Sequence, residues 1–260
     1  RIAQEIGIDK IANFAKSLKI YDNPEELLSI SLGSAETTLL KLTSAYSSFV
    51  NGGKLIEPIF LDRIQDSEGI TIFNSEKRIC EKCKEISYLG NNIPKIKDNF
   101  PQIFSEETAY QITSMLEGVI KRGTGKKLRD LNLDLAGKTG TTNDNTDAWF
   151  VGFTSNLVIG VYVGHDEPKT LGKYETGSKT AMPIFKSFIK NAIKKGDARP
   201  FKVAKNIKFL VIDQKTGKKA HFGSKTTIIE AYKKSNLKNN LLVNDDLNMK
   251  VDKNNILKFY

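Results

Sequence analysis

Residues 133–164 constrain the fold of this chain more than any other stretch. An apolar run leads into Lys138-Thr139-Gly140-Thr141, and this pattern predicts a strand over residues 133–141. Two further apolar runs, 148–154 and 157–164, meet at a short polar turn, which is typical of an antiparallel hairpin. Because these runs are apolar on both faces in places, we expect a sheet that helices cover.

Amphipathic helices are predicted on either side of these strands. Two short helices open the chain, and a third carries apolar residues at helical spacing until Gly52-Gly53 ends it. Ser105 is expected to cap a long helix that Gly123 ends, and Pro183 suits the first turn of another. The apolar stripe predicted for that last helix comprises Ile184, Phe185, Phe188, Ile189, Ala192 and Ile193. The predicted fold class is α+β, an antiparallel sheet flanked by helices.

The rest of the chain divides by composition. Residues 61–73 predict a hairpin, whereas residues 75–101 are polar and lysine-rich, which is typical of an insertion or a mobile loop. Beyond Pro200, a strand-like run over 207–212 precedes a stretch rich in Lys and Asn. We therefore expect a main domain over residues 1–198, with the insertion at about 75–101 inside it, and a C-terminal appendage over residues 199–260.

Composition and charge narrow the class of protein. With 39% hydrophobic and 27% charged residues, the 260-residue chain has the composition of a soluble globular protein. The net charge of +10 raises the hypothesis of a nucleic-acid partner, but the lysines are scattered rather than gathered on one helix, so no such partner is expected. No apolar run reaches the roughly 18 to 20 residues of a membrane span, and we expect no signal peptide within the residues given. Since the chain opens on Arg1, we expect that an upstream segment has been removed.

Cys80 and Cys83 are the only cysteines, and their C-x-x-C pair lies in charged sequence. A zinc ribbon needs a second pair, and His165 and His221 are not at ligand spacing. A redox motif needs a strand before it and a helix opening at it. Surface thiols or a small local disulfide are the favoured interpretations, and no cofactor or metal is expected.

The K-T-G-T run has the composition of a clamp for a peptide that ends in a free carboxylate. A strand edge offers backbone N–H and C=O groups to an extended peptide, and Gly140 leaves room for a close backbone approach. Thr139 and Thr141 point their hydroxyls to one face by the period of two, where they can hold a carboxylate. Lys138 adds a fixed positive charge that favours an anionic substrate.

A second K-T-G shows that the tripeptide alone is weak evidence. Lys215-Thr216-Gly217 lies between polar residues, where a turn is the simpler interpretation. The copy at Lys138 instead follows an apolar strand and precedes a hairpin that contains Trp149, so Lys138 is assigned to the functional copy.

A K-T-G on a strand is also one of three signature elements of penicillin-binding proteins and serine β-lactamases. The chain resembles the C-terminal part of the transpeptidase domain of class A, type 1A penicillin-binding proteins, over nearly all of residues 1–193. The similar stretches are Leu32-Gly33-Ser34 with Glu36, Ala45-Tyr46 with Phe49 to Gly53, Val119 with Gly123-Thr124-Gly125, Gly137 to Thr142, Asp147 to Gly152, Val161 to Gly164, and Ala181-Met182-Pro183.

The resemblance implies a serine acyl transferase that cross-links peptidoglycan stem peptides and reacts with β-lactams. It implies that Lys138 belongs to the catalytic network, that Thr139, Gly140 and Thr141 bind the substrate, and that the Thr141 N–H is one of two oxyanion donors. It also implies an upstream glycosyltransferase domain, a membrane anchor, and a location at the periplasmic face of the bacterial inner membrane. The expected partners are stem peptides and β-lactams.

The other two signature elements, S-x-x-K and S-x-N, do not precede Lys138. S-x-x-K occurs only after it, at Ser187 to Lys190 and at Ser235 to Lys238, and both are interpreted as chance matches. We therefore expect a fold that is incomplete on its N-terminal side and a chain without its nucleophile. The alternative is an inactive fragment or split-gene remnant that at most binds wall peptide or a partner.

Overall fold

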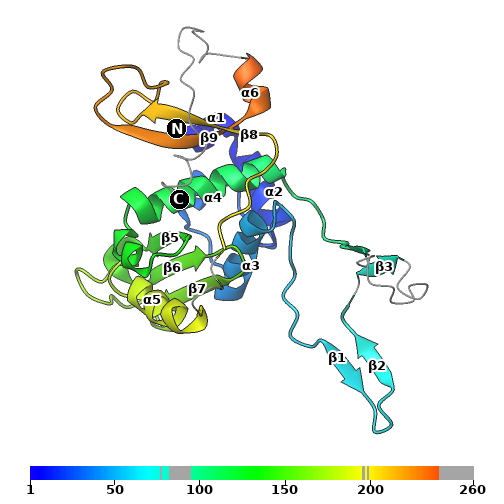
Figure 1. The fold of residues 1–260 in the computed structure, drawn as a ribbon. Helices are drawn as coiled ribbons and strands as arrows, with labels where there is room; N and C mark the ends of the chain where they lie inside the picture. The colour runs from blue at the N-terminus through cyan, green and yellow to red at the C-terminus, as the bar shows by residue number, and fades with distance from the viewer. Residues whose placement is uncertain (77, 82–94, 195–196, 198, 240–260) are drawn as a thin grey trace.

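The centre of the molecule is a three-stranded antiparallel sheet in the order β5-β6-β7. In this computed structural model, residues 1–76, 78–81, 95–194, 197 and 199–239 are described. The strands are β5 (Ala136–Thr141), β6 (Ala148–Phe153) and β7 (Val158–Val163). The predicted strand and the predicted hairpin are therefore confirmed, and Figure 1 shows helices packed around them.

Helices cover both faces of the sheet, as the sequence predicts. Gly160 of β7 faces α3 (Leu39–Val50), because a Cβ built there would lie 2.9 Å from a Leu39 methyl group. Gly152 of β6 faces α5 (Ala181–Ala192), because its Cβ would lie 2.8 Å from the Phe185 ring. Since Gly152 and Gly160 are one register position apart across the β6–β7 pair, α3 and α5 lie on opposite faces.

The main core lies between the sheet and α5. Phe150 and Phe185 are fully buried there, with their ring centroids 4.7 Å apart. The other buried members are Ile120, Leu128, Leu135, Ala148, Ala181, Met182 and Ile189. They come from α4 (Glu106–Arg122), the 3-10 helix η2 (Lys126–Leu131), the strands and α5, so this core joins the elements around β5.

The helix boundaries follow their capping residues. Thr38 accepts a hydrogen bond from the Lys41 N–H at the start of α3, and Ser105 accepts one from Thr108 at the start of α4. Gly123 is the C-cap of α4, as predicted. The chain opens with α1 (Ile2–Ile6), α2 (Ile8–Ser17) and the 3-10 helix η1 (Leu28–Leu32), and the 3-10 turn η3 (Asn143–Asn145) joins β5 to β6.

One prediction for α5 is wrong. Ile184, Phe188 and Ala192 were assigned to its apolar stripe, but all three are exposed, Ile184 and Phe188 by 50% and 54%. The buried residues of α5 are instead Ala181, Met182, Phe185 and Ile189. The reason is geometric: α5 packs mainly on β6 and β7, and a helix that lies on a sheet buries only the stripe that faces it.

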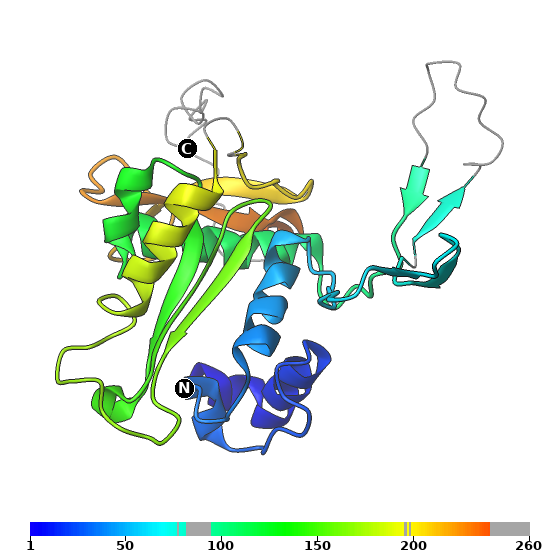
Figure 2. The same ribbon diagram turned by 90° about the horizontal axis from the view of Figure 1, so that it is seen from below.

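An arm made of two β-ribbons leaves the body between α3 and α4 (Figures 1 and 2). Its strands are β1 (Arg63–Gln65), β2 (Thr71–Asn74), β3 (Ile79–Glu81) and β4 (Lys95–Lys97), paired β1-β2 and β3-β4. The predicted 61–73 hairpin is thus confirmed. Cys80 is disulfide-bonded, whereas Cys83 and the rest of residues 82–94 lie outside the described part.

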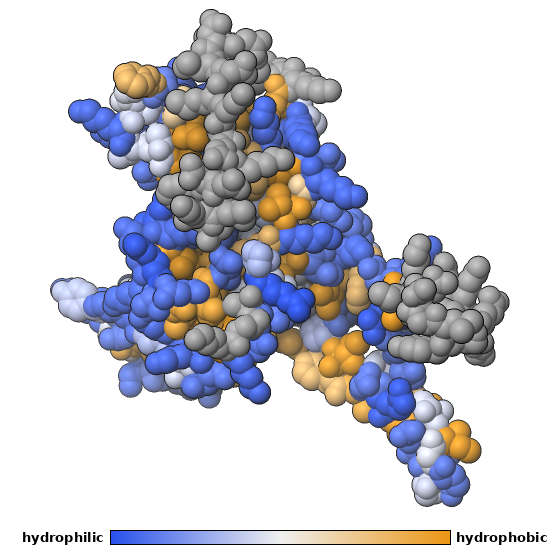
Figure 3. All heavy atoms as spheres, in the orientation of Figure 1, coloured by the Kyte–Doolittle hydropathy of each residue, from blue (hydrophilic) through white to orange (hydrophobic). Residues whose placement is uncertain are grey.

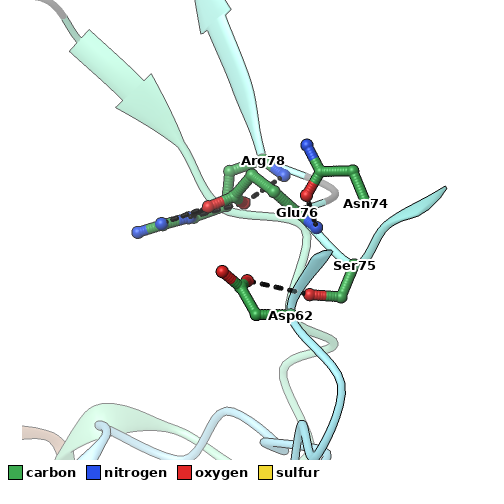
Figure 4. Close-up of polar contacts among 5 residues, drawn as sticks. All are labelled: Asp62, Asn74, Ser75, Glu76 and Arg78. Atoms are coloured by element: carbon green, nitrogen blue, oxygen red, sulfur yellow. Dashed lines mark hydrogen bonds and ion pairs between the residues drawn. The ribbon is translucent and has the colours of Figure 1, made fainter. Parts of the chain in front are cut away.

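Polar contacts fix the junction between the two ribbons (Figure 4). The Ser75 hydroxyl donates to Asp62 at 3.2 Å, and the Glu76 N–H donates to the Asn74 side chain at 2.9 Å. Arg78 donates from its Nε to both carboxylate oxygens of Glu76, at 2.7 and 2.8 Å. These Arg78 hydrogen bonds lower the pKa of Glu76 to about 2, so the pair stays ionised over the physiological range.

The C-terminal hairpin packs on α4. It consists of β8 (Ile207–Asp213) and β9 (Thr227–Lys233), followed by α6 (Lys234–Asn239). A second small core holds it, made of Tyr110 from α4 with Phe201, Ala204, Ile207, Phe209 and Ala231. Among the described residues, no helix combines the length and apolar character that a membrane crossing requires.

Candidate active site

The K-T-G-T run forms β5, an edge strand of the central sheet. In the described part of the chain, β5 pairs with β6 alone, with Lys138 opposite Val151 and Thr141 opposite Ala148. Its second edge pairs with no described strand, and an edge strand of this kind is what a peptide clamp requires.

The register places alternate K-T-G-T residues on opposite faces. Lys138 lies across from Val151, which lies across from Gly160, so Lys138 is on the face that α3 covers. Thr139 lies across from Phe150 and is on the α5 face, as is Thr141. The prediction that both hydroxyls share one face is confirmed, and the ammonium group leaves the strand on the other face.

Lys138 is an exposed cation without an ion pair in the described part of the chain. Its Nζ donates one hydrogen bond, to the carbonyl oxygen of Thr139 at 2.8 Å. An ammonium group has three donors, so two remain for other groups. Next to it, a Cβ on Gly140 would lie 3.0 Å from the Trp149 Cβ, so the absence of a side chain at Gly140 lets Trp149 lie close to β5. Lys138 therefore places an exposed positive charge on the α3 face of β5.

Both threonine hydroxyls are held by neighbouring loops. The Thr139 hydroxyl lies 3.1 Å from the hydroxyl of Thr124, in the Gly-Thr-Gly connection after α4. Thr141 Oγ1 accepts a hydrogen bond from the Gly177 N–H at 3.1 Å. Because Thr141 acts as the acceptor there, its own hydroxyl proton remains free to donate to a ligand.

Gly177 and Thr124 belong to this arrangement, and the sequence did not assign them. A Cβ on Gly177 would lie 2.3 Å from the Trp149 carbonyl oxygen and 2.5 Å from that of Gly140. The loop before α5 is therefore seated directly on the β5–β6 pair, where only glycine fits. The available signal was weak: a glycine in a Gly-rich loop and a Gly-Thr-Gly turn, neither of which indicates a contact with β5.

The second K-T-G is a turn, as predicted. Asp213 Oδ1 accepts hydrogen bonds from the N–H groups of Lys215 at 2.9 Å and Thr216 at 3.1 Å, and Gly217 has a φ of 69°. The bond from the Thr216 backbone is the main reason why the pKa of Asp213 lies below its usual value. The same tripeptide therefore occupies two different structures.

The other candidate groups belong to elements and loops other than β5. Ser187 and Lys190 are exposed on α5, which covers the face opposite to Lys138. Ser235 is exposed on α6, whereas the side chain of Lys238 lies outside the description. His165 and His221 are exposed, and no group of three or more potential metal ligands occurs among the described residues.

This chain has an antiparallel sheet between helices, with K-T-G-T on the edge strand, and these features define the class of protein to which it belongs. Residues 1–190 match the family described as the penicillin binding protein transpeptidase domain, and the chain belongs to this family. Its relatives are of type 1A. Penicillin-binding protein 1A from Rickettsia conorii is 42% identical over 261 residues, and that from Pseudomonas aeruginosa is 31% identical over 264. These matches take in 100% and 90% of this chain but 32% of each relative, so the chain spans about a third of their length.

Solved structures agree with this assignment. The crystal structure of penicillin-binding protein 1A from Haemophilus influenzae is similar with a TM-score of 0.73 and 33% identity, over 88% of this chain and 37% of that chain. The penicillin-binding protein PonA1 from Mycobacterium tuberculosis gives a TM-score of 0.53 at 25% identity, over 69% of this chain and 44% of that chain. The predicted α+β penicillin-binding transpeptidase fold is confirmed.

Proposed function

We propose that this chain carries the substrate-holding part of a serine D-alanyl-D-alanine transpeptidase, with the K-T-G-T strand but without the nucleophile. The edge of β5 that pairs with no described strand supports this function most directly, because β5 carries the Lys138 ammonium group on one face and two positioned hydroxyls on the other. An extended stem peptide can pair along this edge.

Each residue of β5 has a role in the proposed reaction. The Thr139 and Thr141 hydroxyls bind the terminal carboxylate of the donor peptide, and Gly140 allows its backbone to approach. A serine from the upstream part attacks the D-alanyl-D-alanine carbonyl carbon, and the Thr141 N–H donates to the oxyanion that forms. The bond to the terminal D-alanine then breaks, D-alanine leaves with a proton, and an amine of a neighbouring stem displaces the serine oxygen. Lys138 stabilises the negative charge and the proton-transfer network around the serine.

A chimera tests this assignment. The aligned C-terminal part of Rickettsia conorii penicillin-binding protein 1A is replaced by this chain, and acylation by a fluorescent penicillin is measured by intact mass. We expect a stoichiometric adduct on the upstream serine. Lys138→Ala is expected to slow acylation by at least about 10²-fold, because it removes a positioned positive charge. Lys215→Ala, which changes the same tripeptide in the turn, is expected to leave the rate unchanged.

The chain alone provides the second arm of the test. We expect no covalent adduct on the isolated 260-residue chain, since the serine lies outside it. An adduct on Ser187 or Ser235 would contradict the proposal and identify the nucleophile. A folded chimera that does not react would instead favour the alternative, an inactive fragment or split-gene remnant. If the chimera is active, the expected location of the protein is the periplasmic face of the inner membrane. The glycosyltransferase domain and the membrane anchor are then expected upstream of this chain.

A further inference from the structure

The C-terminal hairpin ends in a positively charged surface with an exposed aromatic ring. Lys218, Lys219 and Lys225 flank Phe222 in the sequence between β8 and β9, and all four side chains are exposed. Phe222 is 94% exposed, more than any other large apolar side chain in the described residues. We call these four residues the basic tip. They lie beyond residue 190, where the match to the transpeptidase family ends.

Acidic residues are few in the sequence around the basic tip. Only two acidic residues, Asp213 and Glu230, occur between residues 199 and 234. Asp213 accepts hydrogen bonds from the turn backbone, and Glu230 is paired with Arg122 of α4 at 3.2 Å. Among the ion pairs between described residues, none includes a lysine of the tip. The positive field of the tip is therefore directed to the solvent.

The hairpin holds this surface in a defined position. Gln111 of α4 donates to the Ala231 carbonyl oxygen at 2.9 Å, and the Tyr110 and Phe209 rings lie edge to face at 6.0 Å. Backbone hydrogen bonds order the tip itself, from Ala220 to Val211 at 2.8 Å and from Ser224 to His221 at 3.0 Å. The charges are thus carried on a packed element, which favours a surface for binding over a solvated tail.

The basic tip and the K-T-G-T strand are connected through the end of α4. The Arg122–Glu230 ion pair joins β9 to the last turn of α4, and two residues later Thr124 contacts Thr139 of β5. Figure 1 shows the turn end of the hairpin on the same side of the molecule as the C-terminal end of α4. A long ligand bound along β5 can therefore extend towards the tip.

We propose that the basic tip is a second docking surface for peptidoglycan, which binds the carboxylates of stem peptides outside the acyl-transfer site. The choice of ligand rests on the proposed function, and the surface itself rests on the charges and the exposed ring. Lysine ammonium groups bind scattered carboxylates as point charges, and Phe222 adds apolar contact area. A single exposed ring among lysines fits an extended polar polymer better than a bilayer, which favours a broad apolar face. Docking here keeps a polymeric substrate near β5 between turnovers.

Co-sedimentation with purified peptidoglycan sacculi tests the proposal on the full 260-residue chain. Lys218→Glu/Lys219→Glu/Lys225→Glu is compared with Lys10→Glu/Lys16→Glu/Lys169→Glu, whose lysines are also exposed. The two variants have the same net charge, because each replaces three lysines by glutamates. We expect the tip variant to bind sacculi at least about ten-fold more weakly, with the control near the unchanged chain. Phe222→Ala, which keeps the charge, is expected to weaken binding by about three-fold.

Several outcomes would overturn the proposal. Equal losses in the two triple variants would show that net charge, and not the tip, governs binding. Unchanged binding in the tip variant would show that the tip is not involved. Tip-dependent binding to phosphatidylglycerol vesicles but not to sacculi would assign the surface to a membrane. Circular dichroism of each variant establishes that it is folded. Penicillin acylation of the chimera, which depends on Lys138, reports on the proposed function independently of all three results.

Discussion

At the scale of single residues, the candidate site depends on how neighbouring loops hold two hydroxyl groups. Thr141 accepts a hydrogen bond from Gly177, which leaves the Thr141 proton directed away from the loop. Gly177 can donate this bond because no Cβ separates it from the backbone of Gly140 and Trp149. The orientation of a proposed substrate-binding group is therefore set by a glycine 36 positions away in the sequence.

Gly177→Ala tests this dependence. The added Cβ would overlap two carbonyl oxygens, so the loop must move, at a cost of about 1–3 kcal/mol in unfolding free energy. In the penicillin-reactive chimera, we expect the acylation rate to fall as well, because Thr141 loses its donor. Gly33→Ala is the control, since its φ of 85° costs roughly 1 kcal/mol while a Cβ there meets no atom within 4 Å. Equal acylation in the two variants would show that the loop does not position Thr141.

Glu117 predicts a pH dependence of stability. It is 4% exposed in α4, and burial raises its pKa although Lys121, at 3.1 Å, lowers it. Below the unfolded-state pKa, Glu117 is protonated in both the folded and the unfolded state, so its ionisation does not change the stability. As the pH rises through the folded-state pKa, the buried carboxylate ionises less readily than the unfolded one, so stability falls. Glu117→Gln is therefore expected to raise the Tm at pH 7.5 but not at pH 4, as measured by circular dichroism. Glu106→Gln, an exposed change on the same helix, is the control for net charge, and an equal rise there would contradict the argument.

At the scale of elements, the sequence predicted strands and helix ends well and side-chain contacts poorly. The strands β5 to β7 were predictable because their apolar runs are separated by short polar turns, and α4 was predictable from Ser105 and Gly123. The faces of α5 were not, because apolar spacing cannot tell which side of a helix lacks a partner. The contact of Thr124 with Thr139 was equally hidden, since it depends on the packing of α4 against β5.

Two phenylalanines of α5, one buried and one exposed, allow a direct comparison. Phe185 is fully buried against Phe150, whereas Phe188, one turn along, is 54% exposed. We expect Phe185→Ala to lower the free energy of unfolding by about 3–5 kcal/mol, because it leaves a cavity in the main core. Phe188→Ala is expected to cost less than about 1 kcal/mol. Urea denaturation of both variants measures the difference. Similar costs would show that Phe188 belongs to the apolar stripe, as first predicted.

At the scale of the whole molecule, much apolar surface is left uncovered. The sheet ends at β7, whose outer edge is unpaired in the described part of the chain. The arm exposes apolar side chains as well, and Figure 3 shows hydrophobic residues along it. Phe60 is 83% exposed and Leu61 is 50% exposed. Large exposed apolar patches and unpaired strand edges mark surfaces that bind other chains.

We therefore expect the isolated chain to self-associate with rising concentration, as measured by size-exclusion chromatography with light scattering. Phe60→Ser/Leu61→Ser is expected to reduce association, because each apolar Å² returned to water contributes roughly 25 cal/mol. Leu28→Ser/Leu32→Ser is the matched control, since these side chains are 52% and 91% exposed away from the arm. A monomeric elution profile with a sharp, cooperative melt for the unchanged chain would show that the uncovered surface does not cause self-association.

Trp149 gives the candidate site an optical property of its own. It is the only tryptophan among 260 residues, it lies on β6 directly opposite Gly140 of β5, and its ring centroid is 4.6 Å from that of Tyr162. Intrinsic fluorescence excited at the indole band therefore originates beside the K-T-G-T strand and nowhere else in the chain. A peptide that pairs with β5 changes the surroundings of this one fluorophore, so occupancy of the edge can be followed in unlabelled protein, in real time, without any acylation.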